Sequence, residues 1–146
     1  MFSTISMLCA ETLLAQIPNY SGTWTLNLNK SVLEHKPAGL IGSVFVIKQE
    51  GDHFKLTRIH IFEKKKKKIS FSMRADGKTR TVKILFKGKL EVTETGLRAT
   101  LRRKNFLNIV DYKFGANQNE FIADEVFKGL PQDHHNIWVF DRRVSS

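Results

Sequence analysis

Short runs of alternating apolar and polar residues fill the chain from residue 22 onward, with turn residues at intervals of roughly 8–12 positions. In the clearest run, 97–104, Leu97, Ala99 and Leu101 alternate with basic or polar residues. Successive side chains of a β-strand point to opposite faces, so one face of this run is apolar and the other basic. The pattern is typical of an all-β sandwich or barrel.

Ten such runs are expected to form strands, and they are joined by residues suited to tight turns. The pairs Gly51-Asp52, Asp76-Gly77 and Thr95-Gly96 predict hairpins between the strands that flank them. Closing the strands into a barrel would remove their exposed edges. We therefore predict one all-β domain, an antiparallel up-and-down β-barrel of about 8–10 strands. The expected strands are 23–28, 43–49, 53–62, 69–73, 81–86, 89–94, 97–104, 106–113, 120–128 and 135–142, and residues 29–40 are expected to hold a short helix or a lid-like loop.

The first fifteen residues differ from the rest, because they are small or apolar and carry a single charge, Glu11. Leu13-Leu14-Ala15 is a candidate cleavage site of a secretory signal, although a basic start is missing. We interpret residues 1–15 as an atypical or truncated signal segment and residues 16–146 as the barrel domain. The protein is then exported, to the periplasm or the extracellular space. The alternative is a cytoplasmic protein with an N-terminal arm.

The formal net charge of +10 favours anionic neighbours such as lipid head groups or polysaccharide. The five-lysine run 64–68 lacks the interleaved aromatic residues of single-stranded nucleic-acid sites, so nucleic acid is disfavoured as a partner. A solvated hairpin tip is the alternative interpretation of this run. The candidate anionic-surface residues are Lys64, Lys65, Lys66, Lys67, Lys68, Arg98, Arg102 and Lys104.

The sequence shows no constellation of reactive groups, so we expect no enzyme and no cofactor. Cys9 is the single cysteine and lies in the expected signal segment. His134 and His135 are adjacent, and neighbouring residues of a strand face opposite ways, so we expect a polar turn there and no metal site. No later stretch reaches the ~20 apolar residues of a transmembrane helix. We also expect the protein to be a monomer.

The segment Tyr20–Ser31, with the sequence YSGTWTLNLNKS, resembles the opening of bacterial lipocalin-like secreted proteins. It is also similar to the Gly-Thr-Trp strand that opens fatty-acid-binding proteins, which belong with the lipocalins to the calycin group. The resemblance covers about residues 20–143 and implies that Gly22, Trp24 and Arg142 form a structural clamp at the barrel floor. An arginine over an indole gains a cation–π contact of about 0.5–2 kcal/mol. The alternative is that Trp24 lines a ligand site.

One departure from this family bears on the ligand. Fatty-acid-binding proteins often hold the ligand carboxylate with an Arg-x-Tyr pair on the last strand, and the matching positions here are Trp138 and Phe140. An apolar pair cannot neutralise a carboxylate. A fatty acid held in that manner is therefore not expected, whereas an uncharged or differently oriented lipid stays open.

The alternation also selects the side chains that are expected to face the barrel interior. Among them, Glu125 either contacts a ligand, pairs with an internal arginine such as Arg58, or sits near the open end. We predict that the barrel binds or carries a small apolar ligand; the alternative is a filled-core module that binds anionic surfaces. The candidate cavity lining is Phe54, Leu56, Val82, Ile84, Leu97, Ala99, Leu101, Phe121, Glu125, Phe127, Trp138 and Phe140.

Overall fold

The computed structural model describes residues 17–144 and folds them almost entirely into strands. Each of the ten expected strands is present, with its ends moved by a few residues. The expected signal segment, residues 1–15, and Cys9 lie outside the described residues. The strands are β1 Gly22–Leu26, β2 Val32–Leu33, β3 Leu40–Glu50, β4 His53–Phe62, β5 Lys66–Arg74, β6 Arg80–Lys83, β7 Phe86–Val92, β8 Leu97–Arg103, β9 Phe106–Phe114, β10 Glu120–Gly129 and β11 His134–Arg142.

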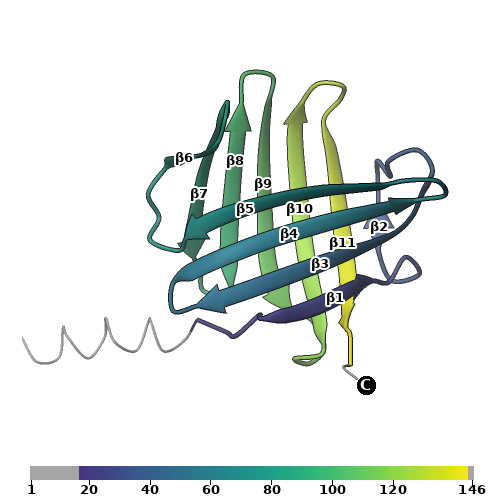
Figure 1. Ribbon diagram of the computed structural model, residues 1–146, viewed down its shortest axis with the longest axis horizontal. Helices are drawn as coiled ribbons and strands as arrows, with labels where there is room; N and C mark the ends of the chain where they lie inside the picture. The colour runs from purple at the N-terminus through teal and green to yellow at the C-terminus, as the bar shows by residue number, and fades with distance from the viewer. Residues whose placement is uncertain (1–16, 145–146) are drawn as a thin grey trace, which may run out of the picture.

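The ten longer strands form one antiparallel sheet in the order β5-β4-β3-β1-β11-β10-β9-β8-β7-β6, and the short β2 pairs with β11. Figure 1 shows how the sheet curls: β1, β3, β4 and β5 cross steeply in front of β8 to β11. Its two ends approach each other where β5 lies beside β6 and β7, although β5 pairs with neither in the described chain. The result is the predicted all-β up-and-down barrel, nearly closed.

One predicted hairpin is wrong. Residues 69–73 and 81–86 were expected to pair across Asp76-Gly77, but β5 and β6 are the two ends of the sheet. The Gly77 amide donates to the Leu90 carbonyl (2.9 Å), and Arg80 forms an ion pair with Asp76. These contacts hold the segment along β7, and the chain reverses instead at Leu85, whose φ is +70°. Asp-Gly correctly predicted a change of chain direction, but the two strands that flank it do not pair with each other.

The segment 29–40 was expected to be a short helix or a lid-like loop, and its described structure contains no helix. It forms turns and the two-residue strand β2. The Ser31 hydroxyl donates to the Asn27 carbonyl (2.8 Å) and accepts from the Val139 amide (2.9 Å). This hydroxyl therefore attaches the segment to β11.

The floor of the barrel is built around Trp24, whose side chain is fully buried. Its indole N–H donates to the Tyr20 carbonyl (2.9 Å), and its ring centroid lies 5.2 Å from that of Phe121. The Arg142 guanidinium carbon lies 4.3 Å from the centroid of the Trp24 ring. Arg142 also donates to the carbonyls of Ser21 (2.9 Å) and Gln118 (3.1 Å), so it links β1 to the turn before β10.

Gly22 is required beside this contact. A Cβ at this position would lie 2.8 Å from Arg142 Nη1, and the glycine φ of +145° is one that other residues rarely adopt.

Throughout the described residues there is no helix long and apolar enough to cross a membrane.

Candidate functional site

The other half of the barrel contains a cavity of about 370 Å³. Aromatic rings line it in a chain that passes from β5 to β7, where the sheet has no hydrogen bonds. The centroid separations are 5.6 Å for Phe71–Phe86, 5.9 Å for Phe86–Phe106 and 5.3 Å for Phe106–Phe127. The lining comprises His35, Pro37, Phe45, Leu56, Arg58, His60, Ile69, Phe71, Met73, Phe86, Ala99, Leu101, Phe106, Asn108, Val110, Tyr112, Glu125, Phe127, His134, Asn136 and Trp138.

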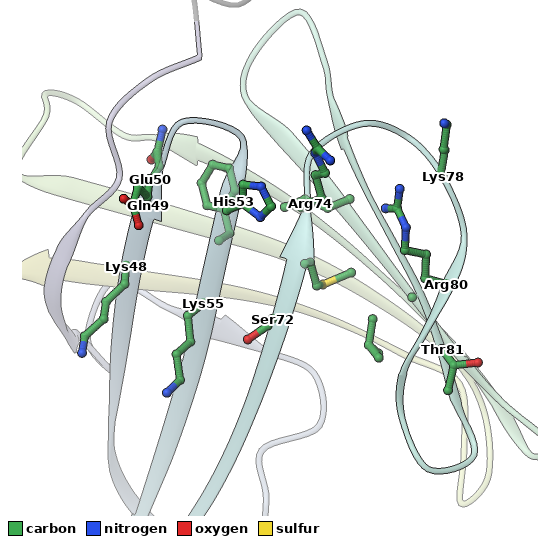
Figure 2. A pocket seen from close by; sticks show the side chains of 15 residues that line it. Lys48, Gln49, Glu50, His53, Lys55, Ser72, Arg74, Lys78, Arg80 and Thr81 are labelled. Carbon is green, nitrogen blue, oxygen red and sulfur yellow. The ribbon is translucent and has the colours of Figure 1, made fainter.

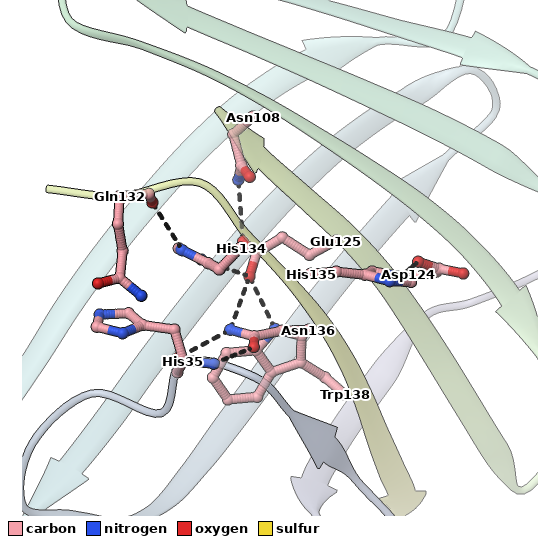
Figure 3. A network of polar contacts seen from close by, with 9 residues as sticks. All are labelled: His35, Asn108, Asp124, Glu125, Gln132, His134, His135, Asn136 and Trp138. Atoms are coloured by element: carbon pink, nitrogen blue, oxygen red, sulfur yellow. Dashed lines mark hydrogen bonds and ion pairs between the residues drawn. The ribbon is translucent and has the colours of Figure 1, made fainter. Parts of the chain in front are cut away.

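A polar cluster around Glu125 interrupts the apolar wall (Figure 3). One carboxylate oxygen accepts from the Asn108 amide (3.0 Å), and the other accepts from the Trp138 indole N–H (3.0 Å). A longer contact of 3.5 Å joins Glu125 to Asn136, and His134 Nε2 lies 4.0 Å away. The carboxylate is therefore oriented by neutral donors of β9 and β11.

Asn136 also fixes the rim of the cavity. Its buried amide donates to the His35 carbonyl (2.9 Å), and its oxygen accepts from the His35 amide N–H (3.0 Å). This reciprocal pair holds the segment before β3 against β11, as Figure 3 shows. The His35 ring then lies 5.0 Å from the His134 ring, which stacks on Phe127 at 4.7 Å. The rings of His35, His134 and Phe127 therefore form one continuous part of the cavity lining.

Arg58 of β4 contacts aromatic rings of the neighbouring β3 and of β11. Its guanidinium carbon lies 4.6 Å from the Trp138 ring centroid, 4.8 Å from that of Phe140 and 5.2 Å from that of Phe45. Its Nε donates to the Ser43 hydroxyl (3.1 Å). Burial lowers the pKa of Arg58, although an arginine stays protonated at any physiological pH. Glu125 does not form an ion pair with it, which corrects one of the expected alternatives.

His60, on the same face of β4, stacks on Trp138 with ring centroids 5.8 Å apart and shares the Ser43 hydroxyl (3.1 Å). Burial, with the nearby Arg58 charge as the second cause, lowers the pKa of His60 to about 4. Burial raises the pKa of Tyr112 to about 12. At neutral pH His60 is therefore uncharged, whereas Arg58 beside it carries a positive charge.

The structure places half of the predicted lining in this cavity. The residues found there are Leu56, Ala99, Leu101, Glu125, Phe127 and Trp138. Four others, Phe54, Leu97, Phe121 and Phe140, are buried in the packed floor half, because the alternation gives the face of a strand but not the height along the barrel. Two were misplaced at the edge: Val82 lines an outer hollow, and Ile84 is 87% exposed at the turn that ends β6.

Sequence reasoning also missed lining residues, notably His60, Asn108 and Asn136, and it named Arg58 only as a partner for Glu125. The alternation already contained a signal for two of them, because Arg58 and His60 share the parity of Leu56 on β4. The polar residues at these inward-facing positions were left out of the predicted lining because an apolar lining was expected. His134 and His135 do face opposite ways: His134 lines the cavity, and His135 binds Asp124 outside it (2.6 Å).

A second hollow of about 750 Å³ opens on the outside, between the ends of β3 to β5 and the segment that enters β6 (Figure 2). Lysine and arginine side chains surround it, but acids balance two of them. Arg74 donates to Asp52 (2.8 Å), and Arg80 pairs with Asp76. It is a groove with charged side chains around it, unlike the cavity lined by aromatic rings.

The basic residues that were predicted to bind anionic surfaces lie in separate parts of the molecule. Lys64 to Lys68 are all exposed around the turn from β4 to β5, with Lys66 to Lys68 paired to β4. Arg98 on β8 instead makes two hydrogen bonds to the Asp111 carboxylate (2.7 and 3.0 Å). Arg102 and Lys104 are exposed at the far end of β8. Binding to anionic surfaces stays a prediction.

Comparisons with known proteins identify a fold but no family. No family model matches this sequence, and no curated protein is similar to it. Among solved structures, the chain is similar to fatty-acid-binding protein 1 of Echinococcus granulosus, with a TM-score of 0.58 and 12% identity over 85% of this chain and 97% of that one. The zebrafish ileal bile-acid-binding protein, solved with cholic acid, gives a TM-score of 0.53 and 14% identity over 85% and 98%.

A secretory abundant heat-soluble protein of Ramazzottius varieornatus is similar to the same degree, with a TM-score of 0.53, 15% identity, and coverage of 84% of this chain and 94% of that one. At these identities the likeness concerns the fold, a calycin-like barrel of the kind found in fatty-acid-binding proteins. The expected likeness to bacterial secreted proteins, and export itself, stay predictions.

Proposed function

We propose that this protein binds one small apolar ligand inside the hollow half of its barrel. The observation that carries the proposal is the cavity of about 370 Å³ inside the barrel, lined by the chain of rings from Phe71 to Phe127. This volume lies within the range of small-molecule sites, which are typically lined by apolar and aromatic side chains with a few oriented polar groups. Two structurally similar proteins are named for binding fatty acids and bile acids, which supports the proposal by analogy.

The geometry favours binding over catalysis. Several polar groups of the cavity are engaged with one another, as in the contacts of Glu125 with Asn108 and Trp138. The arrangement holds a carboxylate and an amide in place without presenting an activated nucleophile to the cavity. We therefore propose a binding or carrier protein.

The proposal is tested by titrating the purified protein with Nile red, a neutral probe whose fluorescence rises in apolar surroundings. Leu101 lines the cavity and its neighbour Arg102 faces outward, so these positions offer a matched pair of variants. We expect Leu101→Trp to fill the cavity and weaken Nile red binding by about tenfold or more, and Arg102→Trp to leave it unchanged. Absence of saturable binding by the wild type, or equal binding by both variants, would contradict the proposal.

Solvent extraction of protein purified without detergent, followed by mass spectrometry, examines the natural ligand directly. We expect an apolar compound at a stoichiometry near one in the wild type and in Arg102→Trp, and much less in Leu101→Trp. A compound recovered equally from all three proteins would be bound outside the cavity.

A further inference from the structure

Arg58 carries hydrogen-bond donors that the protein itself leaves unused. A guanidinium has five N–H donors, and only Nε–H is engaged, by the Ser43 hydroxyl (3.1 Å). Its Nη atoms make no hydrogen bond within residues 17–144. Arg58 lines the cavity, so these donors border the space that a ligand would fill.

The surroundings of Arg58 hold the guanidinium in place without neutralising it. Its carbon lies over the rings of Phe45, Trp138 and Phe140, and the cation–π contacts with these rings do not use its N–H donors as hydrogen bonds would. Across the described chain, no carboxylate forms an ion pair with Arg58. The Glu125 charge acts on Arg58 only from a distance, so a partly desolvated cation with free donors is left without a direct partner. An anion at that edge would relieve the cost.

Glu125 is the acid in the cavity, and its bonding explains why it does not fill this role. Its two oxygens accept from Asn108 on one side and Trp138 on the other, which turns the carboxylate toward β9 and β11. Trp138 therefore contacts both charges: its N–H donates to Glu125, and its ring stacks on Arg58. The indole N–H thus occupies one oxygen of the carboxylate, while the indole ring contacts the guanidinium.

We propose that Arg58 is the head-group residue of the cavity and that the ligand is an amphiphile with a singly charged acidic head, such as a carboxylate or a sulfonate, bound by the Arg58 Nη donors. The inference rests on the proposed function and names the ligand class of that same cavity. It also changes the meaning of Trp138 and Phe140. These rings occupy the positions where the resembling family carries its Arg-x-Tyr pair, and here they support an arginine supplied by β4.

A single negative charge fits better than two because Glu125 already places one negative charge in the cavity. A monoanion beside Arg58 leaves the site with a net charge of −1, and a dianion would leave it with −2. Like charges in a partly desolvated site repel strongly. A phosphate dianion on the same alkyl chain should therefore bind less tightly than the carboxylate.

The test compares dodecanoate, dodecanol, dodecylamine and dodecyl phosphate as competitors of Nile red at neutral pH. We expect dodecanoate to bind the wild type at least about tenfold more tightly than the alcohol or the amine, the ratio that one charge-assisted hydrogen bond provides. Arg58→Met should abolish this preference while keeping the affinity for dodecanol. Arg58→Lys should keep part of it, and Arg102→Met, which changes the net charge equally on the outside, should keep all of it.

The two proposals fail in different ways. Lack of Nile red binding by the wild type would overturn both of them. Binding of Nile red with equal competition by acid, alcohol and amine, or a preference for the acid that survives in Arg58→Met, would overturn the role of Arg58 alone.

A second measurement needs no variant, so it holds even if Arg58→Met does not fold. The carboxyl ¹³C resonance of labelled dodecanoate is followed against pH in the complex with the wild type. Contact with the guanidinium should lower the pKa of the bound acid below that of the free acid. A bound pKa above the free value would place the carboxyl in apolar surroundings and contradict the proposal.

Discussion

Along β10, Phe121 and Phe127 both project into the barrel, but into different surroundings. Phe121 is 1% exposed, and its ring centroid lies within 5.9 Å of those of Tyr20, Trp24, Phe45 and Tyr112. Phe127 stacks on Phe106 and His134 and otherwise lines the cavity. The same strands therefore build a packed floor half and a hollow half. The floor half stabilises the barrel, and this allows the other half to leave space and to hold a cation whose N–H donors are unused.

The largest predicted difference comes from the same substitution in the two halves. Phe121→Ala removes a ring from the packed floor and should lower the free energy of unfolding by about 3–5 kcal/mol. Phe127→Ala enlarges a space that is already open and should cost only about 1–2 kcal/mol. Urea unfolding of both variants measures the difference. Equal losses would mean that the two halves are packed alike.

A smaller effect is expected from the arginine over the floor. Arg142→Met removes the cation–π contact with Trp24 and the hydrogen bonds to the carbonyls of Ser21 and Gln118, so it should cost about 2–3 kcal/mol. Arg143→Met is the matched control, because the Arg143 side chain is exposed, and it should change stability by less than about 0.5 kcal/mol. Thermal unfolding of the two variants tests the structural role of Arg142. A loss of stability in Arg142→Met no larger than that in Arg143→Met would contradict this role.

The hollow half should also respond to pH through His60. Its pKa is about 4 in the folded protein and 6.5 when unfolded, so the unfolded chain binds more protons between these values. Stability from this group is complete above about pH 6.5 and is lost as the pH falls to about 4. We expect the wild type to lose about 1–2 kcal/mol more than His60→Gln over this window, a value reduced because the ring is partly solvated. Parallel pH profiles of the two proteins would show that His60 is not perturbed.

The smallest effect is predicted for a residue that belongs to neither half. Ile84 is 87% exposed, so Ile84→Ser should change the free energy of unfolding by less than about 0.5 kcal/mol. Nile red affinity should not change either. A loss of Nile red binding in this variant would mean that Ile84 lines the cavity, as the strand pattern predicted.

These differences show which features the sequence alone can predict. Strand positions and the contact of Trp24 with Arg142 were foreseeable, because alternation and the Gly-x-Trp resemblance are local signals. The division into two halves was not, since Phe121 and Phe127 have the same parity on one strand. The distinction depends on how many rings from other strands reach each height of the barrel.

Arg58 faces inward as its parity predicts, but it makes contacts that local patterns could not predict. It lies on β4, and the rings of Trp138 and Phe140 lie on β11, which is not a neighbour of β4 in the sheet. These side chains meet only because the sheet curls into a barrel. The false hairpin of 69–73 with 81–86 has the same origin, because Asp76-Gly77 predicts a turn but not that β5 and β6 are opposite ends of the sheet.

The protein has two tryptophans, and each half of the barrel contains one of them: Trp24 is in the floor, and Trp138 lines the cavity. The most direct test of a barrel with one packed and one ligand-binding half is to follow their two indole N–H signals by ¹H–¹⁵N NMR during a titration with dodecanoate. Trp24→Phe and Trp138→Phe variants assign the signals. The account predicts a saturable shift of the Trp138 signal, whose N–H donates to Glu125, and an unmoved Trp24 signal. An unmoved Trp138 signal, or equal shifts of both, would contradict it.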